Sequence, residues 1–358
     1  MSLLYGYKAA KVYAYSNSRV KAMESKLINE QVMQAIINAK DIPSILQILF
    51  QTDYKDAISE FGGLGIKAEL IDFALSKNFA ERVSTLVNVT PIIRKKLIRA
   101  IIGKWDLYNI RLALEAKEKN QGFDSIARYV IDYGRYNASA LKEAMREESI
   151  EALFSRLMIN SPYAGMLRNA LESYKKRKDI IDVLSSLEKD YYAMLKSATM
   201  ELRNIDYGAA VLVKKEIDMR NILLLIRSKI KGARFQDISG YLVDGGNMRR
   251  ESLQSIYSNS EGVEDLASQV SAFDLKESVE AYKKSEEKQL LLFEIGMRNE
   301  IMRTSNRMLK HSVLSFGTMV EYMYLKEIEL FTLRVLIKAK VYGLEKDEIS
   351  RMVVWKID

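Results

Sequence analysis

Apolar residues recur at spacings of three and four along most of the chain, as they do in helices with one buried face. The pattern predicts helices over 18–39, 91–119, 179–203, 205–231, 275–310 and 318–342. No alternating apolar and polar run is bounded by Gly or Pro in the way that strands are. The chain is therefore predicted to be all-α.

Two sequence signals mark expected helix starts. Thr90-Pro91 and Ser161-Pro162 each place an N-cap residue before a proline, which is favoured at the first helical position. Breakers are otherwise scarce, since the 358 residues include 17 Gly and 3 Pro. Such a composition favours long helices over a turn-rich β fold.

The helical pattern occurs three times in succession. The segment 106–110 (Asp-Leu-Tyr-Asn-Ile) resembles 218–222 (Asp-Met-Arg-Asn-Ile), 112 residues later, and a third copy begins at Glu329, another 111 residues on. We therefore expect three related helical bundles over 1–135, which includes an N-terminal extension, 136–246 and 247–358. Such copies form either an open solenoid or a ring-like pseudo-threefold body.

A weaker motif recurs in the other half of each unit. Thr52-Asp-Tyr54, Ser161-Pro-Tyr163 and Ser271-Ala-Phe273 lie 109 and 110 residues apart, and each precedes a helical segment. The other half of each unit therefore repeats more weakly.

Polar positions also repeat within the copies, and they form the candidate site. Each copy carries an acid, an Asn or Thr three residues later, and a Lys eleven residues after the acid. These residues are Asp106, Asn109 and Lys117; Asp218, Asn221 and Lys229; and Glu329, Thr332 and Lys340. At about 100° per residue, the three positions share one helix face. They form a polar seam between bundles, a shared surface that grips a partner, or a solvated face.

Composition excludes several kinds of chemistry. The chain has no Cys and one His, His311, so a disulfide, a Cys nucleophile and a zinc site with Cys or two His are impossible. Residues 62–67 lack the spacing of a phosphate-binding loop. The adjacent acids Glu147-Glu148 and Glu286-Glu287 point about 100° apart on a helix, which does not make an acid/base pair. We expect no catalytic residues, cofactor, metal or small-molecule substrate.

Charge leaves other functions open. The net charge is +8, and the strongest basic cluster, 175–178, is followed by several acids. A nucleic-acid-binding or scaffolding helical repeat is one alternative, and an enzyme that uses only carboxylates and lysines is another. No uncharged stretch reaches the roughly 20 residues that span a bilayer, and the N-terminus lacks a signal-peptide pattern.

Two segments resemble a known family. Residues 13–27 (Tyr-Ala-Tyr-Ser-Asn-Ser-Arg-Val-Lys-Ala-Met-Glu-Ser-Lys-Leu) look like the opening of the C subunit of A/V-type ATP synthases, whose eukaryotic counterpart is the d subunit of V-ATPases. Residues 216–229 are similar to that family's central signature, an acid followed by Asn, apolar residues and Arg-x-Lys, and Gly245-Gly246 fits downstream. The chain departs from a uniform repeat at Thr332, where the other copies have Asn, and at Glu115, where the second has Arg227.

The resemblance implies a non-catalytic rotor part. It implies an all-α funnel of three related bundles with pseudo-threefold symmetry, set between the membrane proteolipid ring and the D and F subunits of the central stalk. Such a protein would rotate with both and transmit torque between proton or sodium transport and ATP synthesis or hydrolysis. It would be peripheral, on the cytoplasmic face of the membrane, and would need no nucleic acid.

Overall fold

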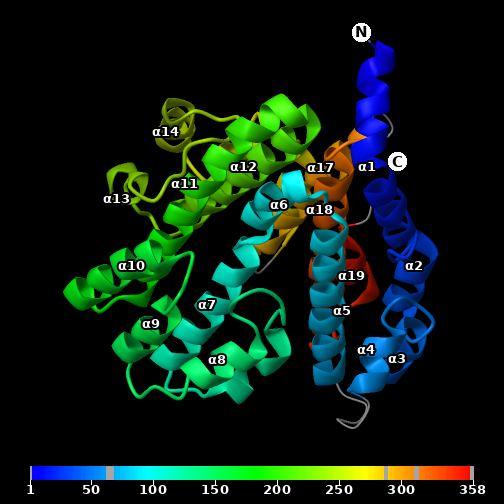
Figure 1. Cartoon of the computed structure of the whole chain (residues 1–358). Helices are drawn as coiled ribbons and strands as arrows, with labels where there is room; N and C mark the ends of the chain where they lie inside the picture. The colour runs from blue at the N-terminus through cyan, green and yellow to red at the C-terminus, as the bar shows by residue number, and fades with distance from the viewer. Residues whose placement is uncertain (1, 62–67, 286–288, 310–313, 355–358) are drawn as a thin grey trace. The chain divides into compact units, whose positions relative to one another are not determined.

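The computed structural model describes residues 2–61, 68–285, 289–309 and 314–354 (Figure 1). In these ranges the regular structure is α-helical or 3-10 helical, and no strand occurs, so the all-α prediction is confirmed. The α-helices are α1 Ser2–Glu24, α2 Glu30–Asn38, α3 Ile42–Leu49, α4 Lys55–Glu60, α5 Ala68–Val89, α6 Lys95–Ile102, α7 Lys104–Glu118, α8 Ala138–Ala144, α9 Ile150–Met158, α10 Ala164–Arg177, α11 Ile180–Ile205, α12 Tyr207–Ile230, α13 Phe235–Ser239, α14 Arg250–Asn259, α15 Val263–Ser268, α16 Lys276–Lys284, α17 Leu291–Leu309, α18 Gly317–Val341 and α19 Lys346–Arg351. The 3-10 helices are η2 Ile92–Arg94, η3 Phe123–Ser125 and η4 Ala127–Tyr129.

Contacts divide the chain into two compact units. The first, which we call the middle unit, is 22–194; the second, the C-terminal unit, joins 1–21 to 195–358. The divisions fall inside α1 and α11, so they separate groups of contacts and do not mark ends of the predicted repeats.

The middle unit is built around α7. Helices α8 and α9 pack on α7, α10 packs on α9, and α5 contacts α4, α6 and η4. A core of this unit is formed by buried residues of the helices from α7 to α11. It includes the fully buried Leu114, Leu141, Leu153, Phe154 and Leu167. Each such side chain contributes about 2 kcal/mol by leaving water.

The C-terminal unit packs α12, α17 and α18 against one another, with α15, α16 and α19 at their sides. Its interior contains charged groups as well as apolar ones. Tyr324 on α18 donates to Glu216 on α12 at 2.5 Å, and Arg298 on α17 donates to Glu294 at 2.8 Å with its guanidinium 4.2 Å from the ring centroid of Phe331. These pairs hold three buried helices in one register, because unpaired buried charges would be costly.

The sequence repeat is visible in how the long helices end. One residue in the left-handed conformation follows each helix: Asn120 (φ 55°) after α7, Gly232 (φ 65°) after α12 and Gly343 (φ 70°) after α18. These positions lie 112 and 111 residues apart, as the sequence motifs do. A left-handed residue closes a helix by letting the chain turn back, and Gly or Asn is the usual choice there.

Two of the ranges predicted as single helices each contain two helices in the structure. The range 18–39 contains the end of α1 and the whole of α2, because Asn29 accepts a hydrogen bond from the Val32 amide at 2.9 Å and starts a new helix. The range 275–310 contains α16, which ends at Lys284, and α17, which begins at Leu291.

The two predicted helix starts were wrong by a few residues. The Thr90 hydroxyl donates to the Leu86 carbonyl at 2.7 Å, so it completes α5 and does not cap a new helix. The Ser161 hydroxyl accepts from the Tyr163 amide at 2.9 Å, and α10 begins only at Ala164. In both cases the hydroxyl bonds a backbone group outside the helix that it was predicted to cap.

A side chain divides the predicted 91–119 helix into α6 and α7. The hydroxyl of Tyr191, which is buried, donates to the carbonyls of Ala100 and Ile101 at 3.1 and 2.9 Å. Those carbonyls would accept from residues 104 and 105 in an unbroken helix. A hydroxyl inserted at this point interrupts the helix.

Candidate functional site

In the first copy, Asn109 joins α7 to the segment that follows it. Its side-chain amide donates to the carbonyls of Ile131 and Tyr136 at 2.7 and 2.9 Å, and its oxygen accepts from the Ile131 amide at 3.0 Å. Asn109 is fully buried. The side chain therefore satisfies buried backbone groups as a neighbouring strand would.

The second copy repeats this contact. Asn221 on α12 donates to the Val243 carbonyl at 2.8 Å and accepts from the Val243 amide at 3.0 Å, again 22 residues further along the chain. It too is fully buried.

The two aspartates hold the same segments slightly further on. Asp218 accepts from the Asn247 amide at 2.9 Å and from the Met248 amide at 3.0 Å. Asp106 accepts from the Tyr136 amide, 30 residues away as Met248 is from Asp218, at 3.5 Å. Burial raises the pKa of both carboxyl groups, and the hydrogen bonds that they accept oppose that rise.

Glycines make room for these carboxylates. A Cβ atom on Gly134 would lie 2.6 Å from Asp106 Oδ1, and one on Gly246 would lie 2.0 Å from Asp218 Oδ1. These glycines lie 112 residues apart. The pairing of Gly134 with Gly246 in the sequence therefore has a steric cause.

The repeated lysines reach a third segment. Lys229 donates to the Tyr257 carbonyl at 2.8 Å, and its ammonium lies 4.7 Å from the centroid of the Tyr257 ring. Lys117 donates to the Glu147 carbonyl in the same way. Acid, amide and lysine thus tie one helix to the next 20 to 30 residues of chain in the first two copies.

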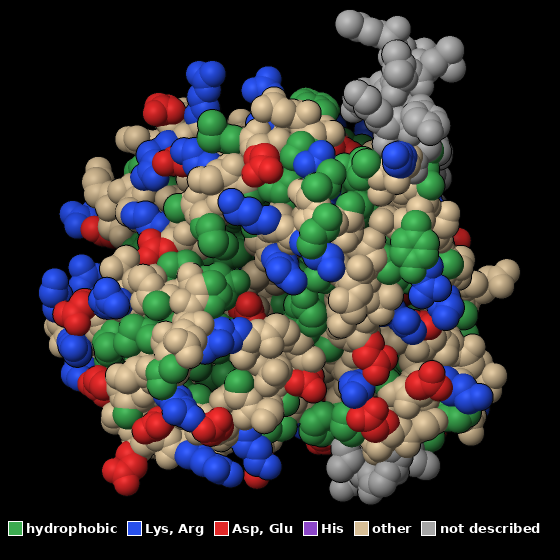
Figure 2. Space-filling view, viewed as in Figure 1, with side chains coloured by type: hydrophobic (Ala, Val, Ile, Leu, Met, Phe, Trp, Pro, Cys, Tyr) green, Lys and Arg blue, Asp and Glu red, His purple; other side chains and the backbone are tan. Residues whose placement is uncertain are grey.

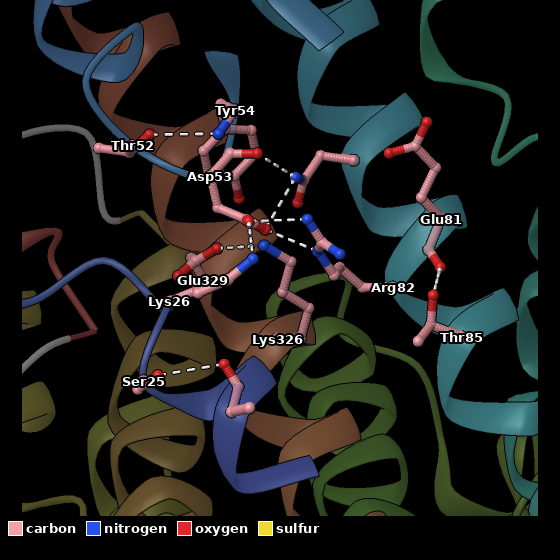
Figure 3. A network of polar contacts seen from close by, with 12 residues as sticks. Ser25, Lys26, Thr52, Asp53, Tyr54, Glu81, Arg82, Thr85, Lys326 and Glu329 are labelled. Atoms are coloured by element: carbon pink, nitrogen blue, oxygen red, sulfur yellow. Dashed lines mark hydrogen bonds and ion pairs between the residues drawn. The ribbon is translucent and has the colours of Figure 1, made fainter. Parts of the chain in front are cut away.

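The third copy is arranged differently. Glu329 and Thr332 are fully buried on α18, and Lys326 donates to Glu329 at 2.5 Å (Figure 3). The Thr332 hydroxyl finds no hydrogen-bond partner among the described residues. Lys340 is half-buried near the end of α18.

The recurring Tyr/Phe motif contacts a repeated acid in one copy and a lysine in the next. The Tyr163 hydroxyl donates to Asp106 Oδ2 at 3.2 Å, and burial together with the nearby Asp106 charge raises the Tyr163 pKa. Phe273, at the next occurrence of the motif, has no hydroxyl, and the Lys215 ammonium lies 4.8 Å from its ring centroid. Lys215 also donates to the Ala272 carbonyl at 3.1 Å, while burial lowers its pKa.

Sequence reasoning missed the position three residues before each acid. It holds Gly103, Lys215 and Lys326 in the three copies. Gly103 leaves space for the Tyr163 hydroxyl, since a Cβ there would lie 2.7 Å from it, whereas the two lysines bring a cation. The offsets of 112 and 111 would have shown that these residues are equivalent, but their different types concealed it.

The first occurrence of the motif also carries an ion-pair network (Figure 3). Arg82 on α5 donates to both Asp53 oxygens at 2.6 and 2.7 Å, and Asn78 donates to the Asp53 carbonyl at 2.7 Å. Lys26 lies 3.6 Å from the same carboxylate. A paired, largely buried Asp53 fastens the turn before α4 to α5.

The strongest basic cluster is balanced by acids. Lys175 pairs with Glu172, Arg177 with Asp182 and Lys178 with Glu151, at 3.1, 2.6 and 2.5 Å. Near the end of α10, at the left of Figure 2, Lys/Arg and Asp/Glu side chains lie side by side. Such a surface gives little net attraction for phosphates, which a nucleic-acid site needs.

Other candidate chemistry is limited. The described part of the chain holds no group of three or more acids or His that could bind a metal ion. None of its helices is long and apolar enough to cross a bilayer. His311, the pair Glu286-Glu287 and the glycine cluster 62–67 lie outside the described residues.

Comparison with known proteins gives one consistent family. Residues 16–352 match the model of the ATP synthase (C/AC39) subunit. Three similar proteins, each named as the C subunit of an A-type ATP synthase, come from archaea. The Thermoplasma acidophilum protein is 22% identical over 96% of this chain and 98% of its own length. The Thermococcus onnurineus protein is 25% identical over 97% and 93%, and the Methanocaldococcus jannaschii protein 22% over 96% and 86%.

Proposed function

Because the chain belongs to the family of the ATP synthase (C/AC39) subunit, we propose that it is the central-stalk coupler of a rotary A/V-type ATP synthase. As a member of that family it is a non-catalytic accessory subunit. In this role it joins the membrane proteolipid ring to the shaft formed by the D and F subunits. It transmits torque between proton or sodium transport and ATP synthesis or hydrolysis. The observation that carries the proposal is the family match over nearly the whole chain.

The proposed architecture is three tandem bundles, 1–135, 136–246 and 247–358, arranged as a pseudo-threefold funnel. Its support is the equal spacing of the left-handed helix ends at Asn120, Gly232 and Gly343. The funnel rests peripherally on the cytoplasmic face of the membrane, with one end toward the ring and the other around the foot of the shaft.

The nine repeated polar residues are proposed to be structural rather than a grip for a partner. Supporting this, Asn109, Asn221, Glu329 and Thr332 are fully buried. Lys117 and Lys229 bind carbonyls of their own chain. A torque-transmitting part must resist bending, and side chains that fasten loops to long helices serve that requirement.

The test is recovery of the complex. Full-length chain carrying an affinity tag is expressed in cells that contain the ATP synthase, and membranes are solubilised in mild detergent. Proteolipid and the D and F subunits should co-purify with the tagged chain. Recovery of the folded chain with none of them, in a preparation from which a tagged catalytic subunit recovers the whole complex, overturns the proposal.

A further inference from the structure

The turn between α5 and α6 (Figure 1) and the first residues of α6 together form residues 91–99, which we call the basic tip. The turn exposes two adjacent isoleucines. Ile92 is 79% exposed and Ile93 is 58% exposed. Leu97 and Ile98, one turn later, are buried, so the isoleucines project from an anchored base. Exposed apolar residues are common singly, but two at the end of a turn leave a solvated apolar point.

Cations follow the two isoleucines closely in the sequence. Residues 83–105 contain no Asp or Glu and carry Arg94, Lys95, Lys96, Arg99 and Lys104. Lys96 and Arg99 are exposed, and Lys95 is half-buried. The cluster 175–178 differs in its sequence, because Asp179 and Asp182 follow it closely.

The equivalent turns of the other two copies lack the exposed isoleucine pair and the run of cations, although the second exposes Tyr207. Where the first copy has 94–96 (Arg-Lys-Lys), the second has 206–208 (Asp-Tyr-Gly) and the third 317–319 (Gly-Thr-Met). In the second copy Asp206 caps α12 by accepting from the Ala209 amide at 3.1 Å. Packing this turn therefore requires neither exposed isoleucines nor cations, so in the first copy these residues can serve another purpose.

We propose that the basic tip binds an anionic membrane surface. Ile92 and Ile93 enter the headgroup layer, and the cations of 94–99 face lipid phosphates. Apolar residues at a point, surrounded by Lys and Arg, are the pattern of peripheral membrane contacts. Because its exposed isoleucines and its cations spread over consecutive residues, the tip suits a broad negative surface better than a single acidic groove. The proposal goes beyond the coupling role and does not depend on it.

The experiment is vesicle flotation of the purified full-length chain. One set of vesicles is phosphatidylcholine alone, and the other contains added phosphatidylglycerol. We expect the chain to float only with the anionic vesicles and to be released by salt, because screening weakens surface attraction. Equal flotation with both kinds of vesicle, or with neither, overturns the proposal.

Matched variants locate the contact. Lys95→Gln/Lys96→Gln should weaken vesicle partitioning by roughly fivefold for each cation removed, and Ile92→Ser/Ile93→Ser should also release the chain. The control Lys175→Gln/Lys176→Gln also removes two positive charges, from the cluster 175–178. This control should retain most of the vesicle binding. Thermal melts check that each variant is folded.

Two outcomes contradict the assignment to lipid. If the control weakens flotation as much as the tip variants do, binding follows net charge rather than the tip. If the tip variants float normally but recover less of the synthase complex, the tip docks on a protein instead.

Discussion

The side chains of Asn109 and Asn221 act at the residue scale as substitutes for backbone pairing. Each fully buried amide both donates to and accepts from one backbone position 22 residues away. Removal of such a group leaves a buried N–H and C=O without partners, and each costs about 1–3 kcal/mol. Each of the loops after α7 and α12 therefore relies on one buried amide as well as on the neighbouring acid.

We expect Asn221→Leu to lower the free energy of unfolding by roughly 2–4 kcal/mol, because the Val243 amide and carbonyl lose their partner. Urea unfolding followed by circular dichroism measures the change. Thr332→Val at the equivalent position is the control and should change stability by less than about 1 kcal/mol, since the buried Thr332 hydroxyl makes no hydrogen bond to a described residue. Similar losses in both variants would contradict the structural role given to Asn221.

The Asp218 carboxyl predicts a pH dependence. Burial raises its pKa above the ordinary value of 3.8, despite the hydrogen bonds from Met248 and Asn247. At a pH between the pKa of the unfolded chain and the raised pKa of the folded protein, the folded protein holds a proton that the unfolded chain has lost. The stability from Asp218 is therefore complete below the unfolded pKa and is lost as pH rises through the folded pKa.

Asp218→Asn cannot titrate, so its stability deficit relative to the natural protein should shrink as pH rises from about 3.5 to about 7. Urea unfolding of both proteins across that range measures the difference. Asp237→Asn is the control with the opposite sign: Arg234 holds the Asp237 pKa below its usual value, so that deficit should grow with pH. A deficit of Asp218→Asn that is constant or widens would refute the argument.

At the scale of elements, one hydroxyl decides whether a long helix is continuous. Tyr191 bonds the carbonyls of Ala100 and Ile101 where α6 meets α7. The residue 111 positions later, Met302, is equally buried but has no hydroxyl, and α12, which contains the counterparts of Ala100 and Ile101 at Leu212 and Val213, is unbroken. The interruption coincides with this hydroxyl and with Gly103, whose counterparts in the unbroken helices are Lys215 and Lys326.

Tyr191→Phe should therefore join α6 to α7. The freed carbonyls of Ala100 and Ile101 accept from the amides of residues 104 and 105, and hydrogen exchange at those amides slows. Stability should change by no more than about 1.5 kcal/mol, because helix bonds replace those to the hydroxyl. Tyr174→Phe removes a hydroxyl that donates to Glu118 and should leave exchange at 104–105 unchanged. Unaltered exchange in Tyr191→Phe would place the cause of the break elsewhere.

The sequence predicted three long helices closely but gave no helix for others, such as α5. Apolar periodicity identified α11, α12 and α18 to within a few residues. It merged α1 with α2 because the Asn29 cap depends on a local bond that periodicity does not report. It misread Thr90 because a hydroxyl serves either the preceding or the following helix with the same sequence signal.

For the whole molecule, repetition was the most informative property. It identified Asp106, Asn109 and Lys117 with their counterparts, although their partners at Ile131, Tyr136 and Glu147 follow from loop conformation and were not predictable. It could not show that Lys215 and Lys326 are equivalent to Gly103, since these residues differ in type. In this chain, the offset between copies is therefore a stronger guide to equivalent residues than the residue type.

The same repetition provides a test of closure, because a pseudo-threefold body and an open solenoid predict different distances between equivalent residues. Lys119, Lys231 and Tyr342 are exposed, adjoin the three left-handed helix ends, and are equivalent at offsets of 112 and 111. The chain contains no Cys, so two Cys introduced in pairs take spin labels only where intended. Pulsed electron-spin distances for 119/231, 231/342 and 119/342 should be similar if the proposed funnel is closed. In an open solenoid the 119/342 distance would be about twice the others, and that result would replace the funnel with a linear array.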